Sequence, residues 1–236
     1  MGYNYPHFDS PFIQGLYNWQ TGLGAGIALF GAWLLWRQVQ AAERHEAERQ
    51  RRRFAAARAT LPHILNELVT YLESAMEWMC SVHSDARQSN PLTDPPPFPI
   101  TIIAALERMI EATSLDQAAE ACITLLRDLQ TFRARIQSVA RASGKPDNIR
   151  VGLHLELEGH MIQAAEIHRR VELLYPFARA EGDQVPEQNA ETYLFKSLSL
   201  LGCSELTFNG VFRRANELDE KRLATHAPES AAIAES

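Results

Sequence analysis

Histidine and glutamate side chains gather on one predicted helix, over residues 150–180. The set comprises His154, Glu156, Glu158, His160, Glu166 and His168. Imidazole and carboxylate groups bind transition metals and act as general acids and bases. A di-iron bundle would need Glu-x-x-His on two helices, and zinc sites use His-Glu-x-x-His or paired Cys-x-x-Cys. None of these motifs is present, so we expect no metal, a surface Glu156–His160 pair and a partly buried His168.

Motifs for nucleotide binding and nucleophilic catalysis are also missing. Gly144–Lys145 lacks the glycine five positions earlier that a phosphate-binding loop requires, and no Gly-x-Gly-x-x-Gly follows a predicted strand. There is no Gly-x-Ser-x-Gly, and no Ser, Cys or Thr lies in a recognisable nucleophile context. The sequence therefore predicts no catalytic residue and no cofactor, and it leans against an enzyme. The alternative is an enzyme or small-ligand sensor whose pocket inside the helices is lined by Glu156, His160, His168 and Tyr175.

The three cysteines are Cys80, Cys122 and Cys203, and each falls in an apolar helical context. Their wide separation in a reducing compartment does not predict a disulfide framework. We expect small buried side chains at all three positions.

The most membrane-like stretch lies near the N-terminus. No Asp, Glu, Lys or Arg occurs from Ser10 to Trp36. Residues 16–36 would form about 31 Å of helix, which matches a hydrocarbon core of about 30 Å. Tyr and Trp residues flank both ends, where amphipathic rings favour the headgroup level. The sequence predicts a single transmembrane helix at 16–36 after a short extracytoplasmic tail at 1–15.

Charge on the two sides of this span predicts its orientation. Only Asp9 precedes it, whereas residues 37–58 hold seven arginines and three glutamates. A cleaved signal peptide would carry its positive charge before the apolar stretch and a cleavage site after it. The positive flank instead predicts an uncleaved anchor in the inner (plasma) membrane, with the N-terminus outside and the C-terminal domain cytoplasmic.

Charge is strongly partitioned along the rest of the chain. The net charge of −6 divides into −1 for residues 1–36 and +4 for 37–58, which leaves −9 for 59–236. An acidic domain of this kind is unsuited to general nucleic-acid binding, which needs a basic surface. The lipid bilayer and other proteins are therefore the expected partners, and nucleic acid is not.

The segment after the span is rich in Ala, Glu, Gln and Arg, which favour helix. Pairing is expected between Glu46 and Arg49 and between Glu48 and Arg52. No apolar stripe runs along this segment, so we expect an arginine-rich juxtamembrane helix at 37–60 that acts as a solvated stalk. Pro62 then predicts a bend or a new helix start.

Helical periodicity continues to about residue 218. Helices are predicted at 61–82, 100–112, 116–139, 150–180 and 189–218, separated by the proline-rich segment at 89–99 and the SGKPDN turn at 143–148. The first of these helices carries a stripe formed by Leu61, Ile64, Leu65, Leu68, Leu72, Met76, Met79 and Val82. The sequence thus predicts an all-α protein, with a cytoplasmic bundle of about four to five helices at 61–222 and a disordered tail at 223–236.

The order of apolar span, arginine-rich helix and Ala-Arg-Ala-x-Leu-Pro helix start resembles uncharacterised single-pass inner-membrane proteins of proteobacteria. The resemblance covers residues 20–75 and includes WRQVQAAERHEAERQRRRFAAARATLPHILNEL. It implies a bacterial inner membrane and no known activity.

These features together favour a membrane-anchored protein-interaction, scaffold or regulatory domain. The partner is either another protein or a second copy of this chain. Gly24, Ala28 and Ala32 place small residues on one face of the span, where two helices can approach closely.

Overall fold

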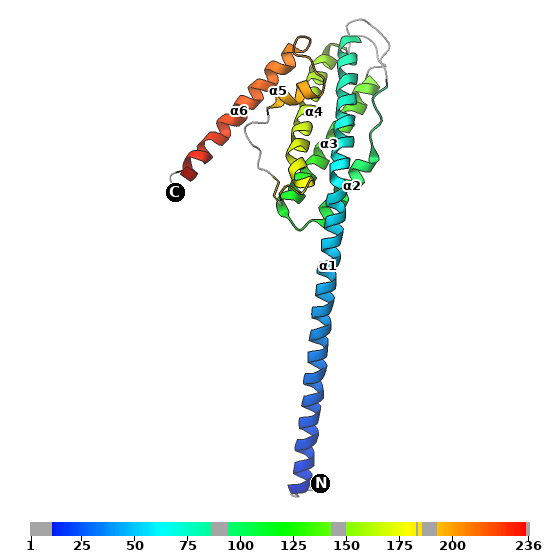
Figure 1. Cartoon of the computed structure of the whole chain (residues 1–236). Coiled ribbons are helices and arrows are strands. Elements are labelled where there is room, and N and C mark those ends of the chain that lie inside the picture. The colour runs from blue at the N-terminus through cyan, green and yellow to red at the C-terminus, as the bar shows by residue number, and fades with distance from the viewer. Residues whose placement is uncertain (1–10, 86–93, 143–149, 183, 186–192, 235–236) are drawn as a thin grey trace, which may run out of the picture. The chain divides into compact units, whose positions relative to one another are not determined.

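The computed structural model describes residues 11–85, 94–142, 150–182, 184–185 and 193–234. Six helices follow one another, and no strand occurs in these ranges (Figure 1). They are α1 (Pro11–Asp85), α2 (Ile100–Ala112), α3 (Asp116–Ala142), α4 (Arg150–Ala178), α5 (Leu194–Leu200) and α6 (Asn209–Ala234). The prediction of an all-α protein is confirmed.

The chain divides into two compact units, Met1–Arg52 and Arg53–Ser236. The first contains the N-terminal part of α1, in which large apolar side chains are exposed as far as Val39. Beyond them lie the predicted ion pairs, with Arg49 3.9 Å from Glu46 and Arg52 hydrogen-bonded to Glu48.

Residues 16–36 belong to α1, without a boundary at either end. Across the described residues, no helix has both the length and the apolar character needed to cross a membrane. The transmembrane helix expected from the sequence is therefore not recovered as a structural element.

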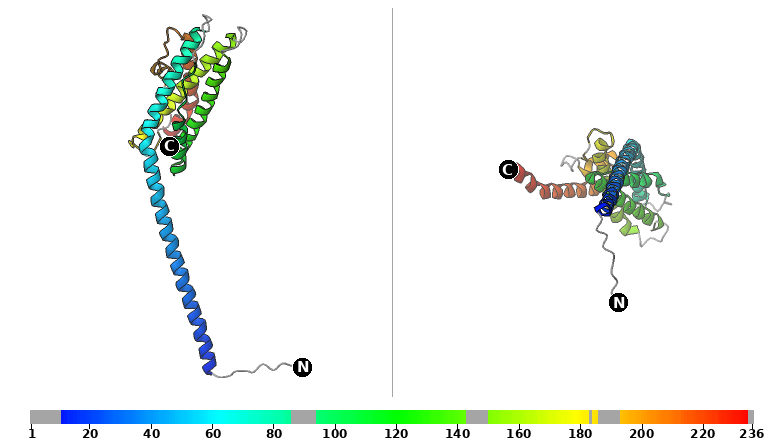
Figure 2. Two further views of the ribbon diagram at one scale, coloured as in Figure 1. Left: turned by 90° about the vertical axis from the view of Figure 1, so that its right-hand side faces the viewer. Right: turned by 90° about the horizontal axis from the view of Figure 1, so that it is seen from below.

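The second unit is a helical bundle built around the later part of α1. Every member of the apolar stripe predicted at 61–82 is buried, from Leu61 (1% exposed) to Val82 (0%). In Figures 1 and 2, α3 and α4 run alongside this part of α1. α3 also contacts α2, while α4 contacts α5 and α6. The amphipathic faces that the sequence pattern identified thus meet in one core.

Each helix contributes apolar side chains at helical spacing. α3 buries Cys122, Leu125, Leu129, Phe132, Ile136 and Val139, and α4 buries Leu157, Met161, Ala165, Val171 and Leu174. The bounds of α2 match the predicted range, since Pro99 and Thr113 have extended backbone at its two ends. The non-helical backbone at 94–99 agrees with the expected proline-rich connection. Residues 86–93 and the SGKPDN turn fall outside the described ranges.

Pro62 does not restart the helix, because α1 includes it as an internal residue. A proline removes one backbone hydrogen bond, and its fixed φ is compatible with helix. Leu61 and Ile64 on either side are buried in the core, and this tertiary packing favours a continuous helix.

The single helix predicted at 189–218 is wrong, because α5 and α6 are separate. Gly202, with φ of 83°, lies between them. The Cys203 N–H donates to Leu198 O at 3.0 Å and the Gly202 N–H to Ser199 O at 3.1 Å. These are the two bonds of a Schellman motif, which ends a helix at a left-handed residue. α6 then continues to Ala234, past residue 222 where the sequence-based bundle boundary lies.

Candidate functional site

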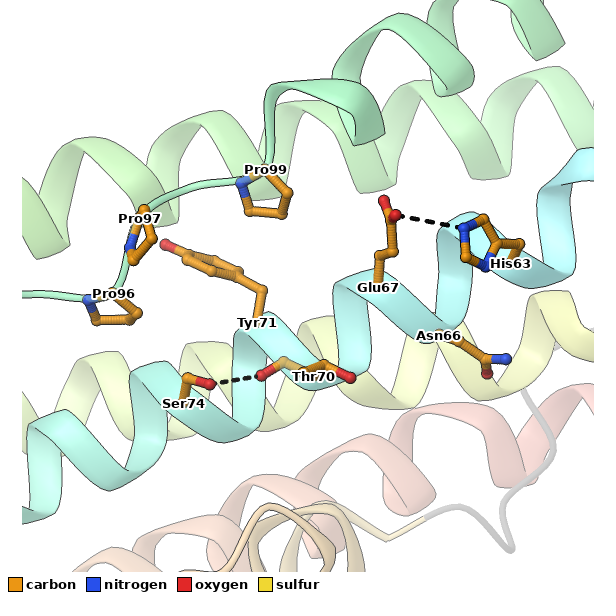
Figure 3. Close-up of a pocket in the computed structure, with 9 residues that line it drawn as sticks. All are labelled: His63, Asn66, Glu67, Thr70, Tyr71, Ser74, Pro96, Pro97 and Pro99. Atoms are coloured by element: carbon orange, nitrogen blue, oxygen red, sulfur yellow. Dashed lines mark hydrogen bonds and ion pairs between the residues drawn. The ribbon is translucent and has the colours of Figure 1, made fainter.

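A groove lies between α1 and the proline-rich backbone before α2 (Figure 3). It has a volume of about 490 Å³. Its lining residues are His63, Asn66, Glu67, Thr70, Tyr71, Ser74, Pro96, Pro97 and Pro99. Successive turns of α1 supply the polar residues, while the three prolines supply a stiff apolar wall.

Tyr71 forms the deepest part of this groove. Its side chain reaches from α1 toward the proline segment (Figure 3) and is only 6% exposed. The ring packs edge-on against Phe98, with centroids 5.1 Å apart, and against Phe132 at 6.4 Å. The Arg133 guanidinium stacks over Phe98 at 4.9 Å from the ring centroid. Burial raises the pKa of the Tyr71 phenol to about 12, although nearby Arg133 acts in the opposite direction.

The polar side chains at the rim are engaged with one another. His63 Nε2 lies 3.4 Å from Glu67 Oε1, as drawn in Figure 3, and Thr101 Oγ1 donates to Glu67 Oε2 at 3.1 Å. Tyr175 Oη of α4 donates to Asn66 Oδ1. These contacts tie the groove to α2 and α4 and orient the rim side chains.

The groove offers binding contacts and no activated reactive group. Burial raises the pKa of the Tyr71 phenol further above neutral pH, so no phenolate forms there as a nucleophile or base. The Ser74 hydroxyl donates to the Thr70 carbonyl at 2.9 Å, so no base is positioned to activate it. An open apolar floor with polar groups at its rim is typical of a ligand- or peptide-binding surface.

A second polar cluster joins α4 and α5, with His168 and Ser197 buried and the Glu172 side chain 47% exposed. His168 Nδ1 lies 3.4 Å from Ser197 Oγ, and His168 Nε2 lies 4.0 Å from Glu172 Oε1. The three residue types are those of an acyl-transfer triad, but His168 is 3% exposed and Ser197 5%. Burial lowers the pKa of His168, and Glu172 and Glu73 oppose this. The cluster pairs polar groups within the core.

The lining predicted for an internal pocket does not come together. His168 contacts Ser197, and Tyr175 contacts Asn66 on α1. His160 has other neighbours, Glu156 and Arg135. Burial, and to a smaller extent the charge of Arg135, lower the pKa of His160, whereas the charge of Glu156 raises it. None of these four side chains lines the groove at Tyr71, the cavity at Arg53–Ala112 or the cavity at Ala42–Arg49. The His154 side chain is outside the part of the chain that the structure describes.

Metal ligands do not cluster among the described residues, where no group of three or more His, Cys, Asp or Glu could hold an ion. Cys122 and Cys203 are buried as predicted, whereas Cys80 is only half-buried.

Among the long-range contacts that the sequence did not predict are those of Arg58 and Asp219. Arg58, assigned from the sequence to the solvated segment, donates from Nε to Phe177 O at 2.8 Å. Asp219 Oδ2 on α6 accepts from the Leu194 N–H at 2.6 Å, at the start of α5. Both pairs join residues far apart in the sequence, so no local pattern could have revealed them.

Comparison with known proteins found no matching family model, no matching curated protein and no matching solved structure. The proposed function is therefore based on the fold and the groove.

Proposed function

We propose that this protein is a non-enzymatic, membrane-anchored helical domain that binds a protein partner. The N-terminal part of α1 supplies the anchor, and the bundle supplies the binding surface. The location proposed is the inner membrane of a bacterium, with the N-terminus outside and the bundle in the cytoplasm.

One observation supports the proposed membrane anchor. Eight large apolar side chains between Ile27 and Val39 are exposed, from 40% at Leu34 to 72% at Leu29. At 100° per residue they cover all sides of the helix and do not form one stripe. A protein partner in a single groove would cover only one side. Lipid covers every side, so we favour a bilayer as the surroundings of this segment.

The flanking charges support the orientation. Ser10–Trp36 carries no Asp, Glu, Lys or Arg, and the arginines begin at Arg37. The Arg37 guanidinium stacks on the Trp33 ring at 5.5 Å from its centroid. An aromatic–cation pair of this kind suits the headgroup level, and the positive flank is retained in the cytoplasm.

The binding role rests on the groove at Tyr71. It joins an apolar floor to polar rim groups, and the described residues hold no reactive group poised in it. Proteins are the preferred partner class because the proline wall and the helical rim form an open surface.

Membrane attachment is tested by extracting cell membranes with alkaline carbonate. The proposal expects the full chain to stay in the pellet and a chain lacking residues 1–36 to appear in the supernatant. Release of the full chain would overturn the anchor. Topology is tested by reporters fused after Ser236, where one active only in the cytoplasm should be active and one active only outside should be silent.

The groove is tested by photo-crosslinking in cells with the probe at Ser74. Thr70→Arg places a bulky cation in the groove and should abolish the crosslinked protein adduct. Thr131→Arg is the matched control, since Thr131 is also an exposed helical threonine, on α3 outside the groove. Equal adducts with both variants, or none with the unmodified chain, would contradict the proposed binding surface.

A further inference from the structure

Two cysteine side chains from distant parts of the chain meet in the bundle. Cys80 belongs to α1, and Cys203 lies in the connection between α5 and α6. Their thiols share a side-chain hydrogen bond, and both are free cysteines. A disulfide between them would bring the two sulfurs to about 2.05 Å.

Neighbouring contacts hold both segments in place. The His83 ring, one turn after Cys80, packs on Phe208 with centroids 5.1 Å apart. Cys203 is held by the hydrogen bond from its N–H to Leu198 O, which follows the left-handed turn at Gly202. The end of α1 and the α5–α6 connection are thus packed together next to the two cysteines.

The two cysteines differ in access. Cys80 is half-buried, whereas Cys203 is 4% exposed. The hydrogen bond from Cys203 lowers the pKa of the Cys80 thiol, although burial and Glu77 oppose this, and the same contact raises the pKa of Cys203. Cys80 is the more accessible thiol and the better source of thiolate.

We propose that Cys80 and Cys203 form a redox-modification site that closes to a reversible intramolecular disulfide on reaction with a hydroperoxide. This inference is independent of the proposed anchor and binding groove.

The reaction balances in two steps. The Cys80 thiolate attacks one oxygen of hydrogen peroxide, so that an S–O bond forms, the O–O bond breaks and the released hydroxide takes a proton to leave as water. Cys80 is then a sulfenic acid. Cys203 sulfur attacks Cys80 Sγ, forming the S–S bond and breaking the S–O bond, and the departing hydroxide leaves as water with the Cys203 proton. A dithiol reductant regenerates both thiols by exchange.

Closure would link α1 to the α5–α6 connection across more than a hundred residues of chain. A cross-link over such a long loop restricts the unfolded chain and stabilises the bundle. We expect the oxidised protein to unfold at a temperature on the order of 10 °C higher than the reduced protein.

The test treats purified full-length protein with a small excess of hydrogen peroxide and maps the cysteines by mass spectrometry. The unmodified chain should lose two hydrogen atoms and yield a Cys80–Cys203 linked peptide, reversed by dithiothreitol. Cys122→Ser is the matched control and should behave identically, since Cys122 is fully buried and its thiol pKa is raised by burial to about 11.

Two further variants separate the roles of the thiols. Cys203→Ser should stop at a Cys80 sulfenic acid that dimedone traps, and Cys80→Ser should show no comparable reaction at Cys203. Irreversible oxidation of Cys80 in the unmodified chain without an 80–203 linkage would overturn the proposal. A disulfide between two chains, or no reaction at all, would overturn it equally.

Discussion

At the residue scale, two helix ends use the same hydrogen bonds with different residues at the left-handed position. α5 ends at Gly202, whereas α4 ends at Ala180, which has φ of 59°. After α4, the Glu181 N–H donates to Pro176 O at 3.0 Å and the Ala180 N–H to Phe177 O at 3.1 Å. An alanine side chain crowds the backbone in this conformation, and glycine avoids that cost.

Exchanging the two residue types should therefore change stability in opposite directions. Ala180→Gly should raise the free energy of unfolding by about 0.5–1 kcal/mol, and Gly202→Ala should lower it by a similar amount. A Cβ at Gly202 would meet no atom within 4 Å, so the loss there is conformational and not steric. Urea unfolding followed by circular dichroism measures both. A loss of stability in Ala180→Gly would contradict this account of the α4 end.

Arg58 behaves differently from the other arginines near it in the sequence. Besides its bond to Phe177 O, it donates to Gly182 O, and its guanidinium lies 4.6 Å from the centroid of the Phe177 ring. It therefore binds carbonyl groups at and beyond the end of α4, where a cation is favourable.

Replacing Arg58 by Ala should lower the free energy of unfolding by about 2 kcal/mol, because a partly buried charge-assisted contact is lost. Arg52→Ala is the matched control, since Arg52 is 78% exposed and pairs only locally with Glu48. The control should change stability by at most about 0.5 kcal/mol. Equal losses in urea unfolding of the two variants would show that Arg58 is an ordinary surface arginine.

His168 should make folding sensitive to acid. Burial lowers its pKa in the folded protein, while Glu172 and Glu73 act in the opposite direction. The unfolded chain, with a histidine pKa near 6.5, then binds more protons than the folded chain as pH falls below about 6.5. The stability contributed by neutral His168 is present above that pH and is lost as pH falls toward its folded-state pKa.

We therefore expect His168→Gln to lose less stability than the unmodified protein between about pH 7 and about pH 5. Urea unfolding at a series of pH values provides the comparison. His63→Gln is the control, because the His63 side chain is 77% exposed. An unchanged pH dependence in His168→Gln would assign the acid sensitivity to other groups, of which His160 is the next candidate.

At the scale of elements, local sequence patterns predicted the helices and boundaries that depend on local side-chain spacing and backbone restriction. The helical periodicity of α2, α3 and α4 and the proline stop before α2 follow from side-chain spacing and backbone restriction. The sequence did not predict the break between α5 and α6, because the helical spacing of apolar residues continues past Gly202. The positive φ of Gly202, which marks the helix end, is visible only in the structure.

The groove was beyond sequence reasoning for a different reason. Tyr71 belongs to α1 and Phe98 to the connection before α2, and their ring contact arises only when the bundle assembles. The prediction of an internal pocket lined by His160 and His168 is not supported, because these residues, eight apart on one helix, contact different neighbours. Side-chain type therefore indicated chemistry without locating a site.

Asp219 couples two of these elements. α5 begins after Tyr193, which provides no side-chain cap, so Asp219 on α6 accepts a hydrogen bond from the buried Leu194 N–H instead. Asp219→Ala should leave that buried donor unsatisfied and lower the free energy of unfolding by about 1–3 kcal/mol. Glu220→Ala, at an exposed neighbouring position, should have little effect. Urea unfolding decides between them, and equal stabilities would contradict the capping role.

At the scale of the whole molecule, the two compact units differ in surface character. The unit ending at Arg52 carries exposed apolar side chains followed by arginines. The second unit contains Arg58, whose contacts belong to the bundle and not to the flank of an anchor. In the proposed topology, the arginines of the first unit, from Arg37 to Arg52, are those that do not also belong to the bundle.

This distinction defines the variant that tests orientation. Replacing Arg37, Arg44, Arg49, Arg51 and Arg52 by Gln removes the arginines of the first unit and keeps Arg53 and Arg58. We expect a cytoplasm-only reporter fused after Ser236 to lose activity in part of the population and an outside-only reporter to gain it, because the charge bias near the anchor is then nearly gone.

The control replaces an equal number of exposed bundle arginines by Gln: Arg127, Arg141, Arg179, Arg213 and Arg214. These lie far beyond the roughly 20 residues over which positive charge sets orientation, so the reporter should stay fully cytoplasmic. The same net charge is removed in both variants, and only its distance from the apolar segment differs. A cytoplasmic reporter in both would mean that the arginines following Trp36 do not orient this chain.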